Sequence, residues 1–203
     1  MMNSTKLDAG YGSEREKSGT KRVFTAGDLT LAGMFAAVLA VLSQLSIPMP
    51  SGVPITIQVF GVALVGEVLG WKLGLFSTLA YVLMGAVGLP VFSGFRGGLS
   101  VLTGVTGGYI WAWPFMTALC GVSVKTGKKA WDLGIRIVLA LVGLAIVETA
   151  GGLQWAALSG DMTAGAVLVY SLVAFVPKDI LITVLAVIVG SMMKRRIAGQ
   201  TGR

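Results

Sequence analysis

Long apolar stretches follow one another through most of this 203-residue chain. Several of them run for about 17 residues or more, the length of helix that crosses a lipid bilayer. The strands of a membrane barrel would instead alternate apolar and polar side chains, and these stretches do not. Charged residues make up 12% of the chain, about half of the fraction usual in soluble domains. The pattern predicts an all-α integral membrane protein with several spans.

The usage of cysteine and histidine excludes several kinds of site. Histidine is absent and Cys120 is the only cysteine. An intrachain disulfide is therefore excluded, and so are metal sites built from histidine and cysteine and catalysis by histidine. Cys120 lies in an apolar stretch, where we expect it to pack as a small hydrophobic side chain. We expect neither a metal nor a cofactor.

Glycine, proline and lysine clusters divide the apolar stretches into six predicted transmembrane helices. These helices cover residues 29–47, 55–69, 73–89, 109–124, 133–158 and a last span inside residues 166–193. Residues 1–28 are polar and mixed in charge, which predicts a disordered N-terminal tail. Residues 29–193 then form the membrane domain, and residues 194–203 form a basic C-terminal tail.

The basic residues indicate how these helices are oriented. With six spans, all of the 16 Lys and Arg residues except Arg96 and Lys178 fall on one side of the membrane. Because cytoplasmic loops carry the excess of positive charge, both termini are predicted to be cytoplasmic. This topology explains the net charge of +7 without a nucleic-acid partner. Glu67, close to Lys72 on the same side, is expected to be an interface anchor.

The last apolar run contains the stretch "FVPKDILITV", which places a proline, a cation and an anion in a row. As one helix, residues 166–193 would be about 42 Å long, more than the roughly 30 Å of the bilayer core. Proline is favoured at the first position of a helix, so Pro177 predicts a final span over residues 177–193. Residues 166–176 are too short to cross and are predicted to form a re-entrant or interfacial segment.

Lys178 and Asp179 then lie in the first turn of the final span, where the helix dipole favours an anion. Side chains at neighbouring positions of a helix do not face each other. We therefore expect no private ion pair between these two residues, and each of them needs another partner.

Ionisable side chains at membrane depth are candidate functional sites, because they are costly there. Glu148 lies in the middle of a predicted helix, and Arg96 is the only basic residue on the outer links. Together with Lys178 and Asp179 they form a predicted mixed-charge site on the outer side. Without Glu148 the set has a net charge of +1, so one carboxylate ligand would neutralise it.

Other side chains complete a predicted small-molecule pocket, which is typically apolar with a few placed polar groups. Hydrogen-bonding groups and apolar walls are expected from Gln58, Tyr81, Tyr109, Phe92, Trp111 and Trp155. The link over residues 92–109 contains six glycines but keeps several large apolar side chains. It is interpreted as a packed lid, with a flexible surface loop as the alternative.

The first predicted helix carries small residues at every fourth position, namely Ala32, Ala36 and Ala40. Such a face lets another helix approach closely. It serves either internal packing or the docking of a partner subunit, and the spacing alone does not separate the two.

Three stretches of the chain resemble the BioY family, the biotin-binding S components of energy-coupling-factor (ECF) transporters. They are "VPITIQVFGV", "YVLMGAVGLPVFSGFRGGLSVLTGVTGGY" and "FVPKDI", within a resemblance that covers about residues 29–193. It implies an S-component fold with six helices in the cytoplasmic membrane of a prokaryote, and biotin as ligand. It also implies that Ala32, Ala36 and Ala40 dock the transmembrane coupling subunit, beside a pair of ATP-binding subunits.

The resemblance also implies roles for the site residues. Asp179 would accept a hydrogen bond from the ureido group of biotin, and Arg96 or Lys178 would bind its carboxylate. Many family members carry a lysine one turn after this aspartate, where this chain has Ile182. We expect biotin to be bound by Asp179, Lys178, Arg96, Gln58, Tyr81, Tyr109, Phe92, Trp155 and Glu148.

Other functions stay open at this point. The sequence has no G-x-x-x-x-G-K-[ST] motif, so uphill transport requires a separate ATPase and the chain is not expected to be an enzyme. The alternatives are an S component for another vitamin and an intramembrane enzyme that uses Glu148 and Asp179. A homo-oligomer is also open, although one chain shows no ring of charge typical of a channel.

Overall fold

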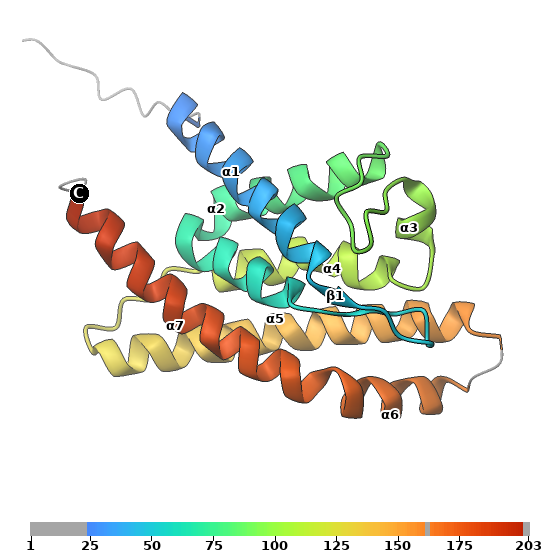
Figure 1. The fold of residues 1–203 in the computed structure, drawn as a ribbon. Coiled ribbons are helices and arrows are strands. Elements are labelled where there is room, and N and C mark those ends of the chain that lie inside the picture. The colour runs from blue at the N-terminus through green and yellow to red at the C-terminus, as the bar shows by residue number, and fades with distance from the viewer. Residues whose placement is uncertain (1–23, 161–162, 201–203) are drawn as a thin grey trace, which may run out of the picture.

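A computed structural model describes residues 24–160 and 163–200 of the protein. Seven helices and two short strands follow one another in this part of the chain (Figure 1). The helices are α1 (Ala26–Gln44), α2 (Gln58–Ala86), α3 (Leu99–Thr103), α4 (Gly107–Cys120), α5 (Lys129–Leu158), α6 (Ala164–Ala174) and α7 (Val176–Gln200). Strands β1 (Ser46–Ile47) and β2 (Ile55–Thr56) pair antiparallel between α1 and α2. Most of the predicted N-terminal tail and the last three residues of the C-terminal tail lie outside the described residues.

The architecture is that of a multi-pass membrane protein. Within the described residues, four helices are long and apolar enough to cross a bilayer: α1, α2, α5 and the part of α7 over Val176–Lys194. Large apolar side chains on these helices, such as Val41, Leu83, Val138 and Leu181, are exposed on the outside of the bundle. In water such surfaces would be unusual, but in a membrane they contact lipid.

Helix α2 consists of two arms that fold back on each other at Gly70. The backbone of Gly70 has φ 78° and ψ 170°, which interrupts the helix and which glycine adopts without a steric cost. The arms pack closely, because a Cβ atom built on Gly74 would lie 3.3 Å from the Cα of Gly66. The bend is tied to the end of α4 by the N–H of Trp71, which donates to the carbonyl of Gly121 at 3.0 Å. The predicted break between residues 69 and 73 is therefore confirmed.

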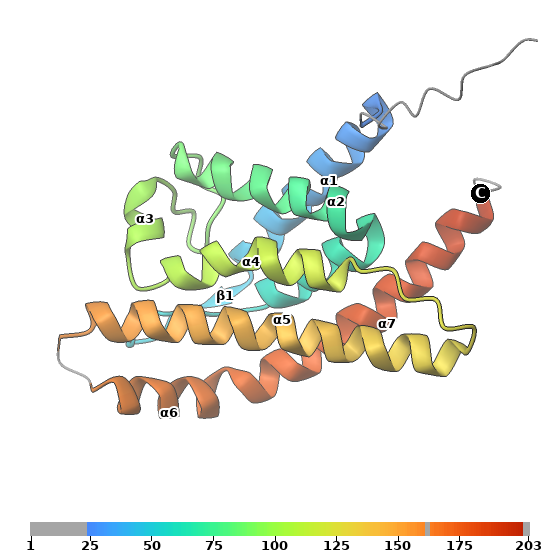
Figure 2. The ribbon, with the colours of Figure 1, turned by 180° about the vertical axis from the view of Figure 1, so that it is seen from behind.

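The core of the bundle forms where α4 packs between α2 and α5, with α7 against α2 and α5 (Figure 2). Buried apolar side chains from all four helices meet there, among them Val62, Met116, Leu144 and Val187. Cys120 is buried in the same cluster, as predicted.

The last apolar run is divided into two helices, as its length predicted. Helix α6 has 11 residues, too few to cross a membrane, and its first turn is capped by the side chain of Thr163. A single residue, Phe175, separates α6 from α7, and the two helices lie nearly end to end beside α5 (Figure 1). Helix α7 begins at Val176, so Pro177 occupies its second position rather than the first.

The alanine face of α1 is closed by α2 in this structure. Ala32 and Ala36 are each 1% exposed and Ala40 is half-buried. The hydroxyl of Ser77 on α2 donates to the carbonyl of Ala32 at 2.7 Å, a contact that requires the two helices to be close. The prediction that these alanines are offered to a partner therefore needs correction, since α2 already occupies their face. The exposed small residues of α1 are their neighbours, including Gly33 and Ala37.

Candidate functional site

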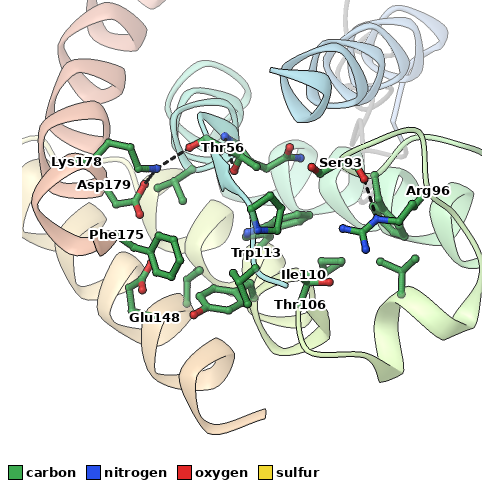
Figure 3. Close-up of a pocket in the computed structure, with 18 residues that line it drawn as sticks. Thr56, Ser93, Arg96, Thr106, Ile110, Trp113, Glu148, Phe175, Lys178 and Asp179 are labelled. Carbon is green, nitrogen blue, oxygen red and sulfur yellow. Dashed lines mark hydrogen bonds and ion pairs between the residues drawn. The ribbon is translucent and has the colours of Figure 1, made fainter. Parts of the chain in front are cut away.

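A pocket lies at one end of the bundle, between β2, the segment before α3, and helices α2, α4, α5 and α7 (Figure 3). Its apolar wall is formed by Val53, Pro54, Val59, Phe92, Val101, Ile110, Trp113, Val147 and Phe175. Its polar groups come from Thr56, Gln58, Ser93, Arg96, Thr106, Tyr109, Glu148, Lys178 and Asp179. This composition, mostly apolar with a few converging polar groups, is typical of a small-molecule site.

Most of the residues predicted from the sequence line this pocket. They are Asp179, Lys178, Arg96, Gln58, Tyr109, Phe92 and Glu148. Two predicted residues lie behind the wall instead. The Tyr81 hydroxyl accepts a hydrogen bond from Nε2 of Gln58 at 3.0 Å and donates to the Val91 carbonyl at 2.9 Å. Trp155 packs against Phe175, with ring centroids 6.4 Å apart. Both support lining residues without lining the pocket themselves.

Lys178 and Asp179 form an ion pair, although their neighbouring positions predicted that they would not neutralise each other; the prediction that Lys178 has another partner is confirmed. Nζ of Lys178 lies 2.6 Å from Oδ1 of Asp179 and 2.6 Å from the backbone carbonyl of Thr56 (Figure 3). The rule for neighbouring helical positions fails here because the lysine side chain is long enough for its ammonium group to reach the carboxylate of the next residue. Asp179 is buried, and a buried carboxylate without a cation is costly. The ammonium group is shared, since it also donates a hydrogen bond to the Thr56 carbonyl in strand β2.

Arg96 lies at the opposite end of the pocket from Lys178 and Asp179 (Figure 3). Its Nε donates to the carbonyl of Ser93 at 3.1 Å, and its backbone pairs with that of Phe92. The pocket therefore has a charged group at each end, with apolar side chains between them.

The segment that holds Arg96 is fastened to α1. The hydroxyl of Ser43 donates to the Val91 carbonyl at 2.6 Å, and the Gln44 amide bonds both the Phe92 carbonyl and the Phe95 N–H. Phe92 is buried, while Phe95 is 72% exposed. The predicted packed lid is therefore confirmed for the part that faces the pocket and is wrong for Phe95 and for Leu99, which is also exposed.

The acidic group on α5 faces the same end of the pocket as Asp179. In Figure 3 the side chain of Phe175 lies between those of Asp179 and Glu148. Atom Oε2 of Glu148 is buried and has no hydrogen-bond partner among the described residues. The hydroxyl of Tyr109, which also lines the pocket, is likewise buried and has no hydrogen-bond partner among the described residues.

One aromatic wall was assigned to the wrong residue of α4. Trp111 is 53% exposed, whereas Trp113 is 8% exposed and lines the pocket. Residues two apart in a helix point to nearly opposite sides, so only one of them faces the core. Sequence reasoning also missed Thr56, Thr106 and Phe175, although Phe175 directly precedes the charged stretch and Thr106 lies in the glycine-rich link.

Two glycines allow the aromatic walls to approach the helices behind them. A Cβ atom on Gly151 of α5 would lie 2.3 Å from the ring of Tyr109. A Cβ atom on Gly85 of α2 would lie 2.0 Å from the ring of Phe92. Any larger side chain at either position would push a ring towards the pocket.

Glu67 is buried away from the pocket rather than anchored at an interface by Lys72. It is 1% exposed and forms an ion pair with Arg136 of α5, with Nε of Arg136 3.3 Å from Oε1 of Glu67. Gly190 of α7 packs on its side chain, because a Cβ atom there would lie 2.6 Å from the Cβ of Glu67. At 1.5 Å per residue, Glu67 lies about 13 Å along the first arm of α2 from Gln58.

Comparisons with known proteins agree with this architecture. A family model described as "BioY family" matches residues 15–199. The probable biotin transporter BioY of Pyrococcus horikoshii is 36% identical over 169 residues, which cover 83% of this chain and 97% of that protein. The biotin transporter BioY of Rhizobium etli is 34% identical over 171 residues, which cover 80% and 90%.

A solved structure is also similar: the S-component for biotin from an ECF-type ABC transporter. It matches with a TM-score of 0.74 and 26% sequence identity, and the match covers 85% of this chain and 95% of that chain. Because the match covers most of both chains, the two proteins share the arrangement of helices described above.

Proposed function

This chain belongs to the BioY family, and we propose that it is the biotin-binding S component of an ECF transporter. Its relatives are transporters rather than enzymes, in line with the expectation from the sequence. The chain would bind biotin on the outer side of the membrane, and separate subunits would supply the energy for uptake.

The observation that supports this proposal most strongly is the order of groups along the pocket. Asp179 and Glu148 lie towards one end, Arg96 lies at the other, and apolar side chains lie between them (Figure 3). Biotin has the complementary order: a ureido ring with two N–H donors, an apolar thiophane ring and a carboxylate. A carboxylate acceptor suits the first group and a guanidinium suits the last.

The hydrogen bonds in the pocket favour Arg96 over Lys178 as the partner of the biotin carboxylate. The ammonium group of Lys178 already bonds Asp179 and Thr56. Arg96 uses its Nε for Ser93, and its terminal nitrogens form no ion pair with the described residues. The proposed contact residues are Asp179, Lys178, Arg96, Gln58, Tyr109, Phe92 and Glu148, with Tyr81 and Trp155 supporting them.

The proposed topology has six spans with both termini in the cytoplasm of a prokaryote. The two arms of α2 count as two passes, and α4 completes the six with α1, α5 and α7. Asp179 and Lys194 are about 22 Å apart along α7, at 1.5 Å per residue. The basic end of α7 is expected in the cytoplasm, so the pocket would face outwards.

The proposed partners are a transmembrane coupling subunit and two ATP-binding subunits, since the sequence lacks a phosphate-binding loop of its own. Because α2 closes the face with Ala32 and Ala36, docking on α1 would use the exposed side with Gly33 and Ala37. Small residues there allow a partner helix to approach closely.

The test is equilibrium binding of radiolabelled biotin to the purified protein in detergent. We expect saturable binding with one biotin per chain and no chemical change of the ligand. The alternatives have different outcomes: saturable binding of another labelled vitamin but not of labelled biotin would assign another ligand, and turnover would indicate an enzyme.

A further inference from the structure

The pocket contains an acidic group that has no hydrogen-bond donor among the described residues. Glu148 lines the pocket from α5, and its buried Oε2 atom makes no hydrogen bond with the residues that the structure describes. A carboxyl group without a partner at membrane depth is costly and marks a candidate functional position. The pocket therefore favours an occupant that brings a hydrogen-bond donor to Glu148.

The cations of the pocket are directed elsewhere. The ammonium group of Lys178 lies 2.6 Å from both Asp179 and the Thr56 carbonyl. Arg96 lies at the opposite end of the pocket (Figure 3). The end of the pocket formed by α5 and α7 thus holds two carboxyl groups and one ammonium group, and the ammonium group is bound to Asp179.

The two carboxyl groups approach this end from different helices. Asp179 begins α7, Glu148 lies in α5, and Phe175 lies between them in Figure 3. Tyr109, from α4, lines the same pocket, and its hydroxyl is buried without a hydrogen-bond partner among the described residues. The end of the pocket therefore offers an acceptor, a hydroxyl and a second acceptor, which match the N–H, carbonyl and N–H groups of a cyclic urea.

We propose that Glu148 is a specificity-determining residue that accepts the second N–H of the ligand's cyclic urea while Asp179 accepts the first. This inference rests on the proposed function, and it explains why the pocket would select a cyclic urea over other head groups. The site selects ligands that carry two N–H donors on one head group.

The test compares two ligands on two variants. 2-Iminobiotin replaces the urea of biotin with a cyclic guanidinium, which is cationic at neutral pH. In Glu148→Gln the side-chain oxygen still accepts an N–H, but the negative charge is gone. We expect the affinity for 2-iminobiotin to fall by about tenfold more than the affinity for biotin, since a charge-assisted hydrogen bond is the stronger one. Thr149→Val, an exposed neighbour on α5, should change neither affinity.

A second measurement uses the unaltered protein. In two cyclic carbamate analogues of biotin, one or the other ureido N–H is replaced by oxygen, with little change of shape. If both N–H groups are bound, each analogue should bind about tenfold more weakly or worse, because each leaves a buried acceptor unpaired.

The outcomes distinguish this inference from the proposed function. If the unaltered protein does not bind biotin, the proposed function fails. If it binds biotin but Glu148→Gln lowers both affinities equally or leaves both unchanged, Glu148 does not select the head group. The inference is likewise overturned if only one carbamate analogue binds more weakly than biotin.

Discussion

Nζ of Lys178 lies 2.6 Å from Oδ1 of Asp179, its neighbour in the chain, and 2.6 Å from the backbone carbonyl of Thr56. One ammonium group thus connects the acidic end of the pocket to strand β2, which lies between α1 and α2. The contact links the start of α7 to a segment 122 residues away in sequence.

Replacement of Lys178 should therefore weaken ligand binding even if lysine does not touch the ligand. In Lys178→Met, Asp179 loses its cation and the carbonyl of Thr56 loses its donor. We expect the affinity for biotin to fall by about tenfold or more, because an unpaired buried group costs roughly 1–3 kcal/mol. Lys129→Met, at the exposed start of α5, is the control and should bind normally. Unchanged affinity in titration calorimetry of Lys178→Met would contradict this role.

Arg96 should recognise the carboxylate of biotin. We expect the unaltered protein to prefer biotin over its neutral amide, biotinamide, by about tenfold, the size of a charge-assisted hydrogen bond. In Arg96→Gln this preference should disappear, since the side chain no longer carries charge. The measurement is the dissociation constant of biotin and of biotinamide for each of the two proteins. If Arg96→Gln still prefers biotin, another cation binds the carboxylate.

Gly151 should be required for the shape of the pocket. A Cβ atom there would lie 2.3 Å from the ring of Tyr109, so Gly151→Ala must push this ring towards the pocket. Overpacking of this kind costs about 1–3 kcal/mol, and we expect both a lower melting temperature and weaker biotin binding. Gly134→Ala is the matched control on the same helix, because nothing lies within 4 Å of its Cβ position. Equal behaviour of the two variants would show that Tyr109 does not depend on this contact.

The ion pair of Glu67 with Arg136 should stabilise the bundle away from the ligand. Removal of the cation in Arg136→Gln takes this partner from the buried carboxylate of Glu67 and should cost about 3 kcal/mol of unfolding free energy, and Glu67→Gln breaks the same ion pair and should also destabilise the bundle. The double variant should be more stable than either single variant, because no uncompensated charge remains. Thermal unfolding in detergent measures this order, and a double variant less stable than both single variants would rule out a direct pairing.

The features predicted from the sequence were those with a local signal. Gly70 marks the bend of α2, and the excessive length of residues 166–193 predicts the break beside Phe175. Most of the pocket could be predicted because charged side chains are rare at membrane depth, and Arg96 and Asp179 therefore stand out.

The features that were missed depend on which face of a helix points inwards. In a membrane both lipid-facing and core-facing positions are apolar, so the sequence does not distinguish Trp111 from Trp113. For the same reason the sequence did not decide whether the face of α1 with Ala32 packs internally or docks a partner. The pairing of Glu67 with Arg136 joins residues far apart in sequence, and only the packing of α2 against α5 brings them together.

The most direct test of biotin binding in this pocket is calorimetric titration of biotin into the unaltered protein and into Asp179→Asn. We expect one biotin per chain in the unaltered protein and an affinity about tenfold or more lower in Asp179→Asn, because the variant loses a charged acceptor and the ion pair with Lys178. Asp179→Asn that remains folded and binds biotin as tightly as the unaltered protein would contradict the account.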